Sequence, residues 1–355
     1  MEGSGEPEHS RKLHSFPSSA GERVNSFDFA LRPLGLRSPD RDTLAASSLS
    51  DPFMTDIAAA DEELLAGLNE AQRQAVKHGT SPLLIVAGAG TGKTTTLTHR
   101  VAWMIHSGID PRRILLLTFT RRAAAEMLSR VGSCLTKMEN SGGQGGKRIA
   151  RAQQNAIWGG TFHAMAVQLL RRHGRLIGLE PDFSVIDRSD SEDLLNVVRQ
   201  ELVRPAEGKR FPLKETCLSI YSRRVNAREP LTKVLANQFP WCIEFEDELK
   251  SVFKGYVSRK EKQHVLDYDD LLLFWNTLVE NSVGADLIRK QFDCVLVDEY
   301  QDTNVLQSEI LQHICPDGRG LTVVGDDAQS IYSFRAATVR NILDFPQQFP
   351  GTTVI

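Results

Sequence analysis

The chain has 355 residues, with 42 basic and 45 acidic side chains and a formal net charge of −3. Its 41% apolar and 25% charged residues are typical of a globular protein of roughly two domains, and this balance neither requires nor excludes a nucleic-acid partner. No apolar run approaches the ~18 residues of a membrane-spanning helix, and the N-terminus lacks the apolar stretch of a signal peptide. The five cysteines occur singly and without zinc-site spacing, so we expect reduced thiols and a cytoplasmic location.

The N-terminal segment has the composition of a disordered tail. Residues 1–53 contain ten Ser, five Pro and four Gly, with no sustained apolar periodicity. Met54 begins the first organised stretch and is an alternative start of translation. Apolar residues then recur at helical spacing over 62–75, which predicts one helix. The segment Ser141–Lys147, SGGQGGK, predicts a surface loop.

Short apolar runs separated by helical patterns predict a parallel α/β sheet. The expected strands are Leu83–Val86, Ile114–Phe119, Ile157–Phe162, Cys294–Val297 and Leu321–Val324, with a sixth beginning at Thr352. Residues 164–281 are mostly helical in pattern and predict a domain inserted into this sheet. Arginine clusters at 171–175 and 223–228 either contact duplex phosphates or form a solvated surface.

A phosphate-binding loop is indicated where the strand LLIV runs into Ala87–Thr94, AGAGTGKT, and then into a helix over 94–105. Backbone N–H groups of 88–93 would surround a β-phosphate, Lys93 would reach the β- and γ-phosphates, and the Thr94 hydroxyl would bind Mg²⁺. The strict motif has Gly where this chain has Ala87, a departure that matters only if that position needs a positive φ.

An acidic pair follows the apolar strand that ends at Val297. Asp298 would hold Mg²⁺, and Glu299 would orient and deprotonate the water that attacks the γ-phosphate. An isolated Asp-Glu pair is usually a solvated strand end, but together with the phosphate loop it predicts an ATP-hydrolysing site.

The longer strings around these residues resemble the UvrD/Rep/PcrA family of superfamily 1 DNA helicases. The matching blocks, in the family's order, are LNEAQ (68–72), LTFT (117–120), AAAEM (123–127), GTFH (160–163), DYDDLL (267–272), VDEYQDTN (297–304) and VGDDAQSIYSFR (324–335). The resemblance implies a RecA-like ATP-binding domain with an inserted helical domain.

The resemblance also implies roles for individual residues. Gln72 would read the adenine edge, and Gln329 would sense the γ-phosphate. The implied catalytic residues are Glu299, Lys93 and Gln329. The implied nucleotide contacts are Gln72, Ala87, Gly88, Ala89, Gly90, Thr91, Gly92, Lys93, Thr94 and Thr95, with Thr94 and Asp298 on the metal. The implied single-strand DNA contacts are Thr118, Phe119, Thr161, Phe162, His163, Tyr332 and Phe334, whose aromatic rings would stack on bases.

The chain departs from the family pattern at three places: Arg121–Arg122 replaces Asn-Lys, Phe334 replaces Trp, and Ala336 replaces Gly. It also ends at Ile355, before the family's second RecA-like domain, so we expect that domain, its γ-phosphate arginines and most of the activity to be absent from this chain.

The resulting expectation is the ATP-binding part of a 3′-to-5′ DNA helicase that uses Mg·ATP to translocate on single strands and unwind duplexes in repair or replication. Repair or replication proteins are possible partners. The expected divisions are 1–55 disordered, 56–163 RecA-like, 164–265 inserted and DNA-contacting, and 266–355 RecA-like. The alternatives are an ATP-dependent DNA-binding module without unwinding, and the front end of an AddA/RecB-type helicase–nuclease. A P-loop kinase or GTPase explains neither the glutamines nor the TFH and DDLL blocks.

Overall fold

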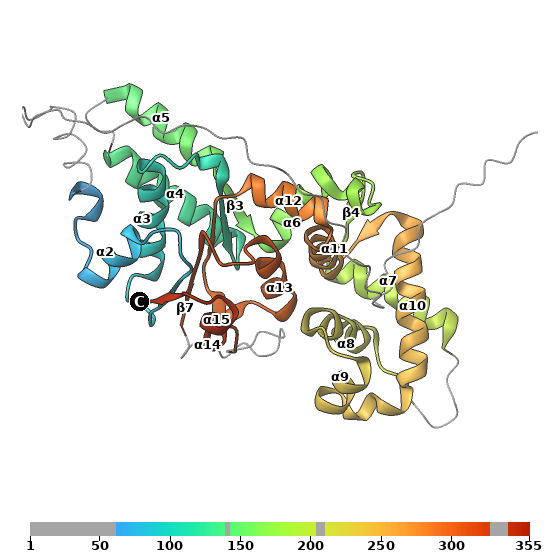
Figure 1. The fold of residues 1–355 in the computed structure, drawn as a ribbon. Coiled ribbons are helices and arrows are strands. Elements are labelled where there is room, and N and C mark those ends of the chain that lie inside the picture. Colours follow the sequence, from blue (N-terminus) through green and yellow to red (C-terminus); the bar gives the residue numbers. More distant parts are fainter. Residues whose placement is uncertain (1–61, 139–142, 204–209, 327–339) are drawn as a thin grey trace, which may run out of the picture. The chain divides into compact units, whose positions relative to one another are not determined.

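Six parallel strands form the main sheet in the computed structural model, which describes residues 62–138, 143–203, 210–326 and 340–355 (Figure 1). The strands are β1 (Leu83–Val86), β2 (Ile114–Thr118), β3 (Trp158–Thr161), β6 (Cys294–Val297), β7 (Leu321–Gly325) and β8 (Thr353–Val354). Their order is β3-β2-β6-β7-β1-β8, and all neighbouring pairs are parallel. The α/β fold with a parallel sheet that the sequence predicts is therefore confirmed.

The apolar character of the strands follows from their position in the sheet. Every residue of β2, β6 and β7 is buried, as expected for central strands covered on both faces. The predicted ranges for β1 and β6 coincide with the observed ones. β3 is one residue shorter than predicted at each end, and β2, β7 and β8 differ by one residue at one end. The edge strands β3 and β8 are partly exposed.

Helices pack on the sheet and on one another. They are α2 (Glu70–Lys77), α3 (Lys93–His106), α4 (Arg121–Met138), α5 (Gly143–Ala156), α6 (Phe162–His173), α7 (Arg188–Leu202), α8 (Lys214–Ala227), α9 (Leu231–Gln238), α10 (Glu246–Gln263), α11 (Tyr268–Glu280), α12 (Ser282–Gln291), α13 (Val305–Ile314), α14 (Arg340–Leu343) and α15 (Phe345–Gln348). Leu97 of α3 and Met127 of α4 are completely buried in one cluster with Leu83, Ile114 and Leu296 of the sheet. This cluster fixes the helix that follows the phosphate loop against the strands.

Helices α7 to α10 pack on one another (Figure 1). In the chain they stand between strands β1 to β3 and strands β6 to β8 of the main sheet. A two-stranded parallel pair, β4 (Ser184–Val185) with β5 (Val265–Leu266), brings the start and the end of this helical segment together. Two-residue strands carry no detectable alternation, so the sequence did not predict them.

Two local predictions were wrong. The helical spacing over 62–75 does not form one helix, because Gly67 adopts a φ of +78° and Asn69 starts α2 with a reciprocal capping box to Gln72. The glycine-rich segment at 141–147 is not wholly a loop, because α5 begins at Gly143. The buried Ala150 seats this helix in the core, and such packing overrides the low helix propensity of glycine.

The five cysteines are buried and none is in a disulfide. Across the described ranges, no helix is both long and apolar enough to cross a membrane. The predicted disorder of residues 1–55 and the alternative start at Met54 fall outside the described residues.

Candidate functional site

The phosphate loop connects β1 to α3 in the way that its sequence predicts. Gly90 and Gly92 have φ values of +76° and +89°, which explains why glycine stands at these two positions. Gly92 is the N-cap of α3 and supplies no side chain to the first turn, so the N–H groups of that turn are available to an anion. Ala87 has no positive φ, and its N–H donates to the carbonyl of Gly325 at 3.0 Å. Alanine is therefore accommodated where the strict motif has glycine.

Lys93 lies among carboxylates at the carboxyl ends of β6 and β7. Its side chain is 8% exposed, and its Nζ lies 3.5 Å from Oδ2 of Asp326 and 3.7 Å from Oε2 of Glu299. A bound phosphate would compete with these carboxylates for the ammonium group. The structure thus brings together two of the predicted catalytic residues, Lys93 and Glu299.

Asp298 is a buried carboxylate next to another acidic side chain. It is 5% exposed, and within the described residues its Oδ1 has no hydrogen-bond partner. Burial and then the neighbouring charge of Glu299 raise the pKa of Asp298 to about 6. A divalent cation would remove both penalties, so Asp298 fits a metal ligand.

Glu299 is held in a strained backbone conformation. Its φ of +51° lies in the left-handed region, which costs roughly 1–3 kcal/mol for such a residue and is found most often at functional sites. The Nε2 of Gln301 donates to Oε2 of Glu299 at 2.6 Å, and the Oε1 of Gln301 accepts from the N–H of Asp326 at 3.1 Å. Gln301 is 2% exposed and therefore fixes the side chain of Glu299 relative to β7.

The sequence analysis missed Gln301 and Asp326 as site residues. Both stand inside the matched strings 297–304 and 324–335, close to the carboxyl ends of adjacent parallel strands. Their positions after strand ends could have identified them as site residues, because the carboxyl ends of neighbouring parallel strands meet at one edge of a sheet.

A cavity of about 340 Å³ opens at this edge. Its lining residues are Thr94, Phe119, Thr120, Ala123, Glu126, Arg130, Asp298, Glu299, Gln301 and Asp302. Both predicted metal ligands, Thr94 and Asp298, thus face the same space. No group of three His, Cys, Asp or Glu side chains suited to a metal occurs in the ranges that the structure covers. One carboxylate and one hydroxyl suit Mg²⁺, which takes its remaining ligands from phosphate and water.

Gln72 sits against the phosphate loop. Its Nε2 donates to the carbonyl of Thr91 at 3.0 Å, and its Oε1 accepts from the N–H of Asn69 at 3.0 Å. A Cβ added at Gly92 would lie 2.7 Å from that Nε2 and would displace the amide, while the φ of +89° itself favours glycine at this position. Its predicted contact with adenine stays a prediction.

Arg100 anchors the helix that carries Gln72. It is 1% exposed on α3, and its guanidinium donates to carbonyls at the end of α2, including Ala75 at 2.8 Å and His78 at 2.7 Å. Its Nε also donates to Oγ1 of Thr322 on β7, and burial lowers its pKa to about 10. The sequence offered no signal for this role, since Arg100 stands among ordinary helix residues.

The predicted DNA residues of the described ranges cluster at the carboxyl ends of β2 and β3. Phe119 is 40% exposed and lines the cavity. His163 is half-buried and packs edge-on against Tyr268, with ring centroids 5.4 Å apart. Tyr268 is 42% exposed beside it and is a further aromatic candidate that sequence analysis missed.

The other predicted DNA residues have structural partners. Phe162 is 5% exposed and packs on Trp275. The buried hydroxyl of Thr118 donates to the carbonyl of Thr120, and the hydroxyl of Thr161 accepts from the N–H of Ala164 as the cap of α6. Their DNA contacts remain predictions. The predicted residues Gln329, Tyr332 and Phe334, and the departure at Ala336, lie outside the described residues.

Most of the clustered arginines are engaged within the chain. Arg171 and Arg172 lie over the rings of Phe183 and Trp158. Ion pairs join Arg175 to Glu180 at 3.3 Å and Arg228 to Glu309 at 2.9 Å.

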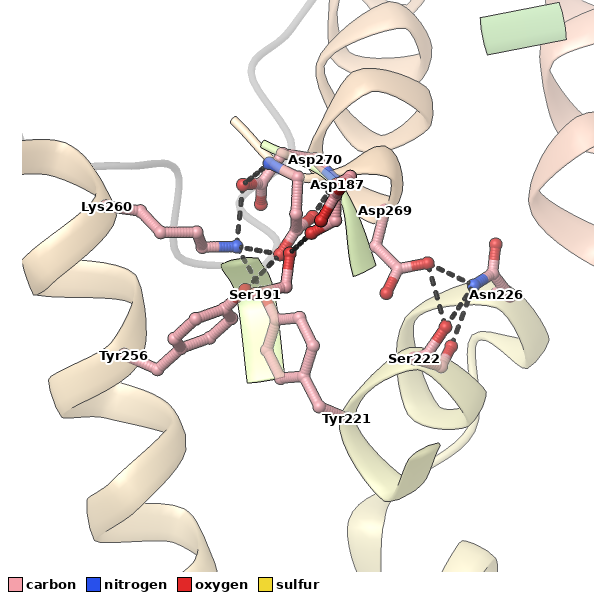
Figure 2. A network of polar contacts seen from close by, with 10 residues as sticks. Asp187, Ser191, Tyr221, Ser222, Asn226, Tyr256, Lys260, Asp269 and Asp270 are labelled. Atoms are coloured by element: carbon pink, nitrogen blue, oxygen red, sulfur yellow. Dashed lines mark hydrogen bonds and ion pairs between the residues drawn. The ribbon is translucent and has the colours of Figure 1, made fainter. Parts of the chain in front are cut away.

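A polar network connects the helical segment to the acidic strand end. Asn304 caps α13, and its Nδ2 donates to Oδ1 of Asn226 on α8 at 2.8 Å. Asn226 in turn donates to Oδ1 of Asp269 at 2.6 Å (Figure 2). Next to Asp269 in sequence, Asp270 pairs with the fully buried Lys260 of α10 (Figure 2). The segment after Glu299 is therefore tied to α8, α10 and α11.

Comparisons with known proteins point to one family. Residues 68–350 match the family described as UvrD/REP helicase N-terminal domain. The ATP-dependent DNA helicase PcrA of Bacillus subtilis is 35% identical over 297 residues, covering 82% of this chain and 37% of the relative. The ATP-dependent DNA helicase UvrD1 of Mycobacterium tuberculosis is 38% identical over 304 residues, covering 83% and 37%. PcrA of Staphylococcus aureus is 32% identical over 296 residues, with coverage of 82% and 37%. The chain thus spans little more than a third of the length of these relatives.

Proposed function

The chain belongs to the UvrD/REP helicase family, and on this premise we propose that it is the ATP-binding part of an ATP-dependent DNA helicase of the 3′-to-5′ type. The observation that carries the proposal is the joint placement of Lys93, Asp298 and Glu299 around one edge of the sheet. These residues come from two strand ends far apart in sequence, and their chemistry is that of an NTP-hydrolysing site.

We propose the following roles, which the positions of the residues support. N–H groups of 88–93 bind the β-phosphate, and Lys93 binds the β- and γ-phosphates. The Thr94 hydroxyl and Asp298 would hold Mg²⁺, which would neutralise phosphate charge there. Glu299 takes a proton from the water whose oxygen bonds to the γ-phosphorus, while the bond to the β–γ bridging oxygen breaks and releases ADP. Gln301 keeps Glu299 oriented, and Gln329 is proposed as the γ-phosphate sensor.

We propose that Gln72 selects adenine. Its amide offers one donor and one acceptor in a plane, as the adenine edge requires. In the structure both of these groups are engaged by Thr91 and Asn69, so reading adenine involves exchanging at least one of these bonds. A modest preference for ATP over GTP is therefore expected.

We propose that single-stranded DNA crosses the carboxyl ends of β2 and β3. Of the predicted residues there, Phe119 is exposed and His163 is half-buried, and the exposed Tyr268 lies beside His163. Stacking on such rings contributes about 1–3 kcal/mol per base and tolerates any sequence. Duplex unwinding, a role in repair or replication, the corresponding protein partners and a cytoplasmic location belong to the same proposal.

We further propose the division into RecA-like parts at 56–163 and 266–355 around an inserted helical domain at 164–265. Strands β1 to β3 and β6 to β8 share one sheet across this interruption, and α7 to α10 pack on one another. The β4–β5 pair closes the insertion near its two ends, which supports boundaries in these regions.

Nucleotide binding and single-turnover ATP hydrolysis test the function, each measured with and without single-stranded DNA. Lys93→Ala is expected to lose nucleotide affinity. Glu299→Gln is expected to retain affinity and lose hydrolysis, because the amide cannot accept the proton of the attacking water. No nucleotide binding by the wild type, or equal binding by Lys93→Ala, would contradict the proposal. Binding without hydrolysis, unchanged by DNA, would favour the alternative of a nucleotide-dependent binding module.

A further inference from the structure

The helix α5 presents a group of cations on its outward face. Ala150 is completely buried in the same core cluster as Cys134 of α4, and Gly146, one turn earlier, is buried as well. The side of α5 that carries these two residues therefore faces the core. Lys147, Arg148 and Arg151 are exposed, and position 151 lies one helical turn after both 147 and 148. We call these three residues the α5 cation cluster.

The cluster has a local excess of positive charge. The helix contains no acidic residue between Gly143 and Ala156. None of the three cations takes part in an ion pair with any residue the structure describes, whereas the neighbouring Arg112 and Arg113 pair with Asp110 and Asp293. The whole chain carries a net charge of −3, so this excess is a local feature and not the result of a basic composition.

The cluster lies away from the nucleotide site. Helix α5 packs against the 3-10 helix Pro111–Arg113, which immediately precedes β2, and α5 ends two residues before β3. Both positions mark the amino ends of the parallel strands. The phosphate loop, Asp298 and Phe119 all follow carboxyl ends, so the α5 cluster serves neither the nucleotide nor the proposed single-strand track.

We propose that the α5 cation cluster binds the phosphate backbone of duplex DNA. Three exposed, unpaired cations are complementary to a polyanion, and duplex DNA carries one charge per about 1.7 Å of its axis. Single-strand sites combine cations with aromatic rings for base stacking. Helix α5 has no aromatic residue, so it is suited to a nucleic acid whose bases are already stacked inside. This inference rests on the proposal that the protein acts on DNA.

Fluorescence anisotropy with a labelled duplex and a labelled single strand of the same sequence, over a salt series, tests the inference. The variant Lys147→Gln/Arg148→Gln/Arg151→Gln is expected to bind duplex about tenfold more weakly at low salt. Its plot of log affinity against log salt is expected to be shallower by about 2 to 3, since each lost phosphate contact removes about one unit of slope. Its affinity for the single strand should stay within about twofold of the wild type.

Two matched variants serve as controls. Lys147→Arg/Arg148→Lys/Arg151→Lys keeps the three charges and is expected to keep the duplex slope. Lys77→Gln/Lys290→Gln/Arg319→Gln removes three exposed charges elsewhere and is expected to behave as the wild type. Circular dichroism establishes that each variant is folded.

Several outcomes would overturn the inference. These are an unchanged duplex slope in the first variant, an equal loss of single-strand binding, or an equal effect of the scattered control. An unchanged duplex slope with loss of binding to an acidic peptide would assign the cluster to a protein partner instead. In these cases the proposed function still stands. If the wild type binds neither form of DNA at any salt, the proposed function fails together with the inference.

Discussion

Replacing Lys260 by methionine is expected to destabilise the protein strongly, because two buried carboxylates would lose their cation. Lys260 is fully buried, and its Nζ lies 2.6 Å from Oδ2 of both Asp267 and Asp270. The hydroxyl of Tyr256 also donates to Asp267 at 2.8 Å. Burial opposes the charge of Lys260, but Asp270 and Asp267 together hold its pKa above the usual lysine value. The ammonium group is therefore charged at neutral pH.

The magnitude follows from removing one partner of a buried ion pair, which costs about 3–5 kcal/mol of the free energy of unfolding. Methionine has nearly the volume of lysine, so no large cavity adds to this cost. At about 2–4 °C per kcal/mol for a domain of this size, the melting temperature is expected to fall by roughly 6–20 °C.

The loss should depend on pH. Burial, and then the charge of Asp267, raise the pKa of Asp270 to about 7 in the folded protein, above its value of about 4 in the unfolded chain. The folded state therefore binds more protons than the unfolded chain between about pH 4 and 7, and stability falls as pH rises through this range. Lys260 favours the ionised form of Asp270, so its removal raises the pKa of Asp270 further. The pH range over which stability falls then extends to higher pH. The deficit of the variant is expected to be larger at about pH 8 than at about pH 5.

Urea denaturation followed by circular dichroism measures the effect at both pH values. Lys262→Met, an exposed change on the same helix, is the control and should stay within about 0.5 kcal/mol of the wild type. Adding Asp267→Asn and Asp270→Asn to Lys260→Met removes both uncompensated charges and should recover part of the loss. A loss below about 1 kcal/mol at the higher pH, or the same loss at both pH values, would refute the reasoning.

Three further predictions concern the nucleotide and DNA sites. In Asp298→Asn, Mg²⁺-dependent binding of a fluorescent ATP analogue should weaken at least about tenfold. Binding by the wild type should decline as pH falls through about 6, because Asp298 gains a proton there. A pH profile of wild-type binding that stays flat contradicts this. In Gln72→Ala, competition binding should show a reduced preference for ATP over GTP, and an unchanged preference contradicts adenine reading. In Phe119→Ala, anisotropy should show single-strand affinity about 5- to 100-fold weaker, as stacking on one base predicts, while Phe119→Tyr retains it.

Much of the fold and part of the site follow from local sequence. Buried strands such as β1 and β6 read as short apolar runs because parallel central strands are covered on both faces. The loop at 87–94 is recognisable because positive φ values at Gly90 and Gly92 restrict those positions to glycine. The placement of Lys93, Asp298 and Glu299 at one edge of the sheet could be predicted, because such residues follow the carboxyl ends of parallel strands.

Other features depend on contacts between distant segments, and no local pattern encodes them. Arg100 stabilises the end of α2 through carbonyls more than twenty residues away, and Gln301 joins Glu299 to Asp326 on the next strand. The pairing of Lys260 with Asp267 and Asp270 turns three ordinary surface residue types into a buried network.

The sequence by itself determined the identity of the family, the parallel sheet and the positions of the chemical groups, because backbone conformation and residue type at strand ends are local properties. Only the tertiary structure decided which of these groups face the same cavity and which predicted residues are buried, such as Thr118 and Phe162. It also decided that α5 forms a helix, which packs in the core through Ala150. Burial and pKa depend on what the rest of the chain places around a side chain, and that surrounding exists only once the chain has folded.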